Sequence, residues 1–136
     1  MTTRIGRLAI GFFLLAAGVA SAQTPRTGAV MREKLAHSQK ILEALTTSNY
    51  ALLDREAEAL TRIAASPVWA ELRTKELRPY TDNFLKAVAD LAAAAKRRDL
   101  DTAATYYNSM TMACYQCHRH LKDVRIAIAM QARSTS

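Results

Sequence analysis

Two cysteines and a histidine near the end of the chain are the residues with the clearest chemical potential. They read Cys114-Tyr115-Gln116-Cys117-His118, the C-x-x-C-H spacing that attaches c-type haem. On a helix, positions 114, 117 and 118 share one face, so both thiols can form thioethers with the vinyl groups along one side of a porphyrin. The imidazole that follows can then bind the iron. The motif predicts covalently bound haem c, with His118 as the proximal iron ligand.

Three other uses of these residues fit the sequence less well. A dithiol oxidoreductase carries its cysteine pair at a helix start, where the helix dipole lowers the thiol pKa, but this pair is expected deep inside a helix. A zinc site needs about four ligands, and only His37 and His120 remain beyond the motif. A disulfide between residues three apart would distort a continuous helix. Haem attachment is the preferred interpretation.

A second iron ligand is predicted near the start of the first helix. In an antiparallel up-down bundle this start lies beside the later half of the last helix, which carries His118. The Met31 thioether could therefore bind the iron opposite His118 and give a low-spin site of raised potential. The alternative, that Met31 is ordinary core filling, stays open because methionine packs flexibly. His37 and His120 are expected on the solvated surface.

The first 22 residues have the pattern of a secretory signal peptide. Arg4 and Arg7 are its basic region, positions 8–20 are apolar, and Ala20-Ser21-Ala22 is a small-residue cleavage site. The apolar run is shorter than the roughly 20 residues that a membrane-spanning helix needs. We therefore expect an exported, periplasmic protein whose mature domain comprises residues 23–136, without a membrane anchor.

The rest of the sequence predicts an all-α fold. Apolar residues recur at alternating steps of three and four, which indicates helices over about 29–46, 50–65, 79–98 and 102–130. The segment 68–78 is left open, as a short helix or a loop. Short connections favour an antiparallel up-down four-helix bundle. The inward face of the first helix is expected to hold Met31, Leu35, Ser38, Leu42 and Leu45, and that of the last helix Ala103, Tyr107, Met110, Cys114, Cys117, Leu121, Val124 and Ile128.

With these features together, the mature chain resembles the class II cytochromes c, the cytochrome c prime family. The resemblance rests on four helices, the Val68-Trp69 pair, Phe84, and the placement of the haem motif near the C-terminus. It implies thioethers at Cys114 and Cys117 and proximal ligation by His118. Where the family often has an aromatic and a basic residue after the histidine, this chain has Leu121 and Lys122. Low-spin members carry a first-helix methionine on the iron and are electron carriers.

Composition and motifs narrow the function further. No Ser/His/Asp set, Gly-rich phosphate loop or inward pair of carboxylates is found, so an enzyme is not expected. The net charge of +7 is spread among acidic residues, which argues against nucleic-acid binding. We expect a one-electron carrier that meets redox partner proteins and could form a homodimer. The alternative is a cytochrome with an open sixth site that binds nitric oxide or carbon monoxide.

Overall fold

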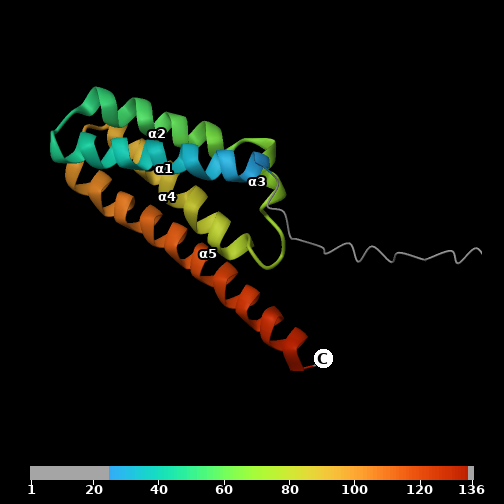
Figure 1. The fold of residues 1–136 in the computed structure, drawn as a ribbon. Helices are drawn as coiled ribbons and strands as arrows, with labels where there is room; N and C mark the ends of the chain where they lie inside the picture. The colour runs from blue at the N-terminus through green and yellow to red at the C-terminus, as the bar shows by residue number, and fades with distance from the viewer. Residues whose placement is uncertain (1–24, 135–136) are drawn as a thin grey trace, which may run out of the picture.

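The structure, a computed structural model, describes residues 25–134, which form helices joined by short turns and loops, without a strand in that range. The predicted signal peptide, residues 1–22, lies outside the described residues. The all-α prediction is confirmed. Within the described range there are five helices (Figure 1): α1 (Pro25–Thr46), α2 (Tyr50–Ala64), α3 (Pro67–Glu71), α4 (Arg78–Lys96) and α5 (Leu100–Ser134). None of them is long and apolar enough to cross a bilayer.

The turns between the long helices are fixed by side-chain caps. The Asn49 side chain accepts a hydrogen bond of 3.0 Å from the Leu52 amide, and the Asp99 carboxylate accepts one of 3.0 Å from the Thr102 amide. Such caps satisfy amides that a helix start leaves without partners. The polar residues at 46–49 and 99–101 are typical of turns and helix caps in the sequence, and the structure confirms both.

Two helix boundaries differ from the prediction. Helix α1 begins at Pro25, earlier than the predicted start at about position 29, so a loose N-terminal tail up to Gly28, which the polar sequence there predicts, is wrong from Pro25 onward. Proline suits the first turn of a helix because its missing amide is not needed there. The segment 68–78, which the sequence left open as a short helix or a loop, contains most of α3 followed by a loop. Ser66 starts α3 by accepting a 3.3 Å hydrogen bond from the Trp69 amide, and α3 then packs on α1 and α2.

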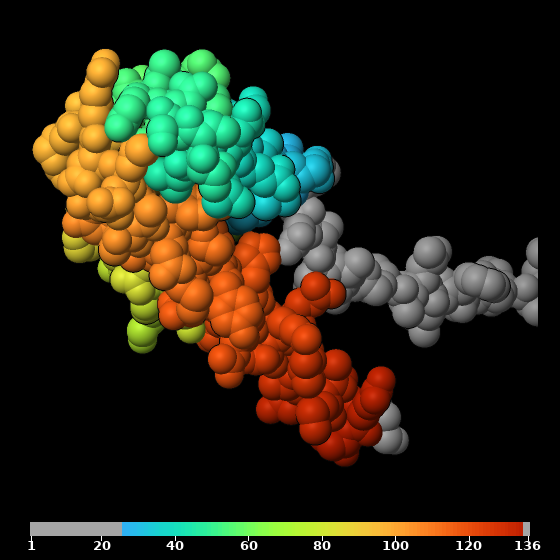
Figure 2. All heavy atoms as spheres, turned by 90° about the vertical axis from the view of Figure 1, so that its left-hand side faces the viewer, coloured from blue at the N-terminus to red at the C-terminus, as the bar shows by residue number. Residues whose placement is uncertain are grey.

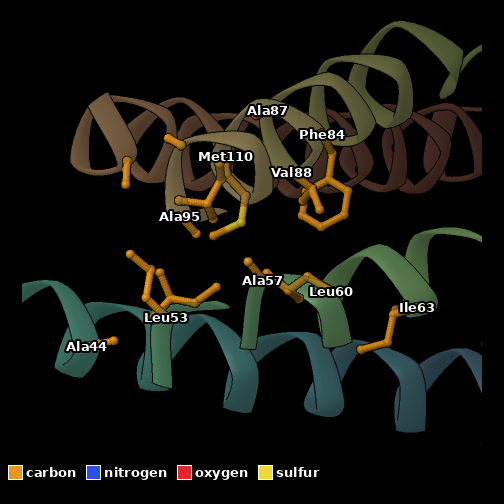
Figure 3. Close-up of a cluster of buried hydrophobic side chains, with 14 of the residues drawn as sticks. Ala44, Leu53, Ala57, Leu60, Ile63, Phe84, Ala87, Val88, Ala95 and Met110 are labelled. Atoms are coloured by element: carbon orange, nitrogen blue, oxygen red, sulfur yellow. The ribbon is translucent and has the colours of Figure 1, made fainter. Parts of the chain in front are cut away.

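The four longer helices form two packed pairs that face each other. Helix α1 packs on α2 and α4 on α5, while α2 faces α4 and α1 meets α5 over a smaller area. The interface between the pairs is an apolar core (Figure 3), in which Leu53, Ala57 and Leu60 of α2 face Phe84 and Val88 of α4. Apolar spacing in the sequence predicts these inward residues for the two middle helices, and all but Ala64 and Leu77 are buried: Leu53, Ala57, Leu60, Ala64, Leu77, Thr81, Phe84, Val88, Leu91 and Ala95.

The inward face of the first helix was predicted wrongly at Leu35 and Leu42, whereas Met31 and Leu45 do pack against the core. Leu35 and Leu42 are 59% and 48% exposed, whereas Ile41 and Ala44 are fully buried. The buried positions lie next to the predicted ones on the helix, because α1 turns Ile41 and Ala44 toward the core it shares with α2. Met31 remains inward, as a half-buried residue packed against this core.

The last part of α5 extends beyond the other helices. Residues 122–134 are all exposed, and Figure 2 shows this end standing away from the body. Val124 and Ile128 were predicted to face inward, and this prediction is wrong. The reason lies in α4, which begins at Arg78 and places Tyr80 against His120, with 5.1 Å between ring centroids. Past this contact α5 has no neighbouring helix among the described residues.

Candidate haem-attachment site

The three residues of the haem motif lie about halfway along α5, on the side that faces α1. Cys114 and Cys117 are half-buried and His118 is exposed. They border a cavity of about 420 Å³, which is within the range of small-molecule and cofactor sites. Its walls come from α1, α3, α4, α5 and the loop before α4, and include Met31, Lys34, Trp69, Leu72, Leu77, Tyr80, Thr81, Phe84, Ala113 and Leu121. Met31 and the haem motif, far apart in the sequence, line one cavity.

A second cavity of about 400 Å³ adjoins the same residues. Leu35, Ser38 and Tyr107 line it, together with four residues that also line the first cavity: Met31, Lys34, Cys114 and His118. The Met31 and Lys34 side chains therefore stand between two spaces that both reach the motif. A planar group attached to the two cysteines could extend into either space when these side chains move.

Both cysteines are free thiols, and their surroundings keep them protonated near neutral pH. Burial raises the pKa of Cys114, and the nearby charge of Lys34 offsets this only in part. Burial likewise raises the pKa of Cys117, again partly offset by Lys34. Catalytic dithiols have the opposite shift, since a lowered pKa supplies the reactive thiolate. The raised values therefore disfavour the dithiol oxidoreductase interpretation.

Lys34 is a site residue that the sequence analysis missed. Its side chain is buried, with a residue exposure of only 7%, and its Nζ lies 3.7 Å from the Phe84 ring centroid and 4.1 Å from that of Trp69. Burial lowers the pKa of Lys34, and the charges of the two cysteines oppose this shift. The available signal was its spacing, three positions after Met31, which places both residues on one helix face.

The Trp69 indole is the second notable polar group in the cavity wall. Trp69 is 3% exposed and stacks at a tilt on Phe84, with 4.8 Å between ring centroids. Its buried Nε1–H has no hydrogen-bond partner. Buried donors are almost always paired in folded proteins, so a bound group with an acceptor at this position would complete the pairing. Trp69 thus belongs both to the apolar core and to the cavity wall.

These observations fit haem c. The two half-buried thiols, three positions apart on a continuous helix, can bond to the two vinyl groups, and the His118 imidazole one turn beyond Cys114 can bind the iron. The aromatic and aliphatic lining suits a porphyrin face. The unpaired indole donor suits a cofactor with polar substituents.

The zinc alternative finds no support in the positions of the other histidines. Within residues 25–134, no three His, Cys, Asp or Glu side chains gather in a way that could hold a metal ion.

His37 and His120 were predicted on the solvated surface, and both predictions are wrong. His37 is half-buried between α1 and α2 with Glu56, and His120 is half-buried against Tyr80, because a residue beside a helix interface gains cover from the neighbouring helix.

Comparison of the chain with protein-family models, curated proteins and solved structures finds no match. The functional assignment therefore rests on the motif and on the residues that surround it.

Proposed function

We propose that this protein is an exported c-type cytochrome that carries single electrons. Cys114 and Cys117 would hold haem c by thioether bonds, His118 would be the proximal ligand, and Met31 the ligand on the opposite face. Bound haem supplies an iron that alternates between its ferric and ferrous states. The protein residues would hold the porphyrin, provide the two axial ligands and limit the access of water to the iron.

The observation that carries this proposal is the shared cavity. The C-x-x-C-H spacing alone is a short pattern, but here its three residues border a space of about 420 Å³ that Met31 also lines. Met31 comes from α1, as a ligand opposite the α5 motif must. Two separate parts of the sequence, one in α1 and one in α5, thus line a single cavity with residues that could attach haem and bind its iron.

The wider proposal includes the resemblance to the class II cytochromes c. We propose that α1, α2, α4 and α5 form an antiparallel up-down four-helix bundle, with α3 as a short addition in the connection before α4. The packing of α1 on α2, α2 on α4 and α4 on α5 supports this arrangement. Residues 1–22 would direct export to the periplasm, where c-type haem is attached.

Basic residues that follow the motif would meet the redox partner. Arg119, Lys122 and Arg125 are exposed on α5, and Arg119 approaches Asp123 at 3.9 Å. A basic rim of this kind raises the rate of encounter with an acidic partner at low salt. The acidic face of a partner protein is therefore the expected docking surface.

The test is to express the full chain in a host that attaches haem in its periplasm and to isolate the exported protein. A mass increase equal to one haem that survives denaturation, together with sharp low-spin bands after reduction, supports the proposal. If the reduced protein binds carbon monoxide readily, the gas-binding alternative holds instead. A colourless protein with two free thiols or a disulfide contradicts both.

A further inference from the structure

Two hydrogen-bond donors in the cavity wall lack acceptors, and they lie next to each other. The Lys34 ammonium is in contact with two aromatic rings and makes no ion pair or hydrogen bond within residues 25–134. The Trp69 Nε1–H is buried and equally unpaired. Lys34 Nζ lies over the Trp69 ring, 4.1 Å from its centroid, so the two donor-bearing side chains are neighbours in the cavity wall.

An anionic acceptor would suit these two neighbouring donors. A buried ammonium is costly without a counter-charge, and contact with aromatic rings offsets only part of that cost. A buried indole N–H needs an acceptor as well. The one carboxylate in the cavity lining, Glu71, is exposed and forms no ion pair with Lys34. A group that enters the cavity with a carboxylate would satisfy both donors at once.

We propose that Lys34 and Trp69 anchor a propionate carboxylate of the bound haem. This inference rests on the proposed function, since haem carries two propionates on the side of the ring opposite the vinyl groups. Lys34 supplies the charge and Trp69 a neutral hydrogen bond. Both are positioning residues: they fix the rotation of the porphyrin in the cavity while the thioethers fix its other edge.

A competing role for Lys34 would be direct ligation of the iron by its amine. That role accounts for a buried lysine beside Met31, but it leaves the Trp69 donor without an acceptor. Propionate binding accounts for both donors. The two roles also differ chemically, because arginine can replace lysine as a carboxylate partner and stays charged, so it is not expected to replace an amine ligand.

The experiment uses the haem-loaded protein with four variants. Lys34→Gln removes the charge and keeps the chain length, Lys34→Arg keeps the charge, and Trp69→Phe removes only the indole donor and some ring area. Lys40→Gln, on the exposed side of α1, is the matched control for loss of one positive charge. Two quantities are measured: the reduction potential as a function of pH, and the absorption bands that report the axial ligands.

The potential changes with pH where a propionate titrates. In Lys34→Gln the midpoint pH of this change is expected to rise by about one unit or more, because the carboxylate loses its opposite charge. A smaller rise in the same direction is expected for Trp69→Phe. Lys34→Arg and Lys40→Gln should keep the wild-type midpoint, and no variant should alter the axial-ligand bands.

Each result that would contradict the proposal can be told apart from the others. An unmoved midpoint in both Lys34→Gln and Trp69→Phe, or failure of Lys34→Arg to keep the wild-type value, overturns the anchor. Altered axial-ligand bands in Lys34→Arg overturn it in favour of iron ligation by the amine. A wild-type protein without haem removes the proposed function, and the anchor with it.

Discussion

The His37 Nδ1 atom lies 2.6 Å from the Glu56 Oε2 atom, so a hydrogen bond joins α1 to α2. Glu56 is only 3% exposed and also accepts a hydrogen bond of 3.1 Å from the Arg55 Nε–H. A carboxylate at this depth is stable only with such partners. The pair therefore connects the two helices through charge as well as through apolar contact.

Glu56→Gln is expected to lower the free energy of unfolding by about 1–3 kcal/mol near neutral pH, because the negative charge is lost and one of the two buried acceptor oxygens becomes an NH2 donor. Thermal or urea unfolding followed by circular dichroism measures this. The matched control is Glu58→Gln on the same helix, where the side chain is half exposed and a change below about 0.5 kcal/mol is expected. Equal effects in both variants would contradict the role of the Glu56 pair.

The acid dependence of stability should also change in Glu56→Gln. Burial alone raises the pKa of Glu56, but hydrogen bonds from His37 and Arg55 and the charge of Lys40 outweigh it, so the pKa lies below its ordinary value. Its contribution to stability is full above that ordinary value and is lost as the pH falls through the folded-state pKa. Urea unfolding at a series of pH values below 5 should show this loss in the wild type and not in the variant.

Met31→Ala is expected to leave haem attached while it opens the sixth coordination site. The two thioethers do not involve Met31, so covalent haem content should not change. The reduced protein should then bind carbon monoxide, which is read from its absorption spectrum. Met112→Ala, an exposed methionine on α5, should keep the wild-type spectrum. An identical spectrum in Met31→Ala and the wild type would exclude Met31 as an iron ligand.

Loss of both thiols should abolish covalent haem. In the double variant Cys114→Ala/Cys117→Ala the protein mass after denaturation should equal that of the bare polypeptide, whereas each single variant can keep one thioether. Tyr115→Phe, between the cysteines and exposed, serves as the control. Haem that stays bound through denaturation in the double variant would contradict the proposed attachment.

The corrected inward face of α1 can be tested by a pair of leucines. Leu91 of α4 is fully buried, so Leu91→Ala should cost about 2–5 kcal/mol of unfolding free energy. Leu42 of α1 is largely outside the core, and Leu42→Ala should cost no more than about 0.5 kcal/mol. A large loss in Leu42→Ala would support the face predicted from the sequence instead.

Apolar periodicity predicted the helices and the inward faces of the two middle ones. It failed for α1 because this helix also carries apolar residues beside the predicted row, Ile41 and Ala44, and only the positions of the other helices decide which row is covered. It failed at the end of α5 for a different reason. The pattern at Val124 and Ile128 continues past the point where α4 begins, so no described helix covers it.

Buried polar residues, like the helix faces, were predicted only in part from the sequence. The C-x-x-C-H motif could be recognised in the sequence because its proposed chemistry depends on spacing within one helix. Lys34 and Glu56 were missed because burial of a charged residue depends on partners from other helices, such as Phe84 for Lys34 and His37 for Glu56. Sequence spacing gives the face on which such a residue lies, but it does not give the neighbours that make its burial tolerable.

The shared cavity joins residues from opposite ends of the described chain, Met31 on α1 and His118 on α5. A chain still emerging from the translocation channel would present the first of these long before the second exists outside. Under the proposed function, methionine ligation would therefore be a late event, after α5 has met α1. A maturation enzyme would meet the C-x-x-C-H segment before the opposite wall closes, with the reactive sulfurs still open to it.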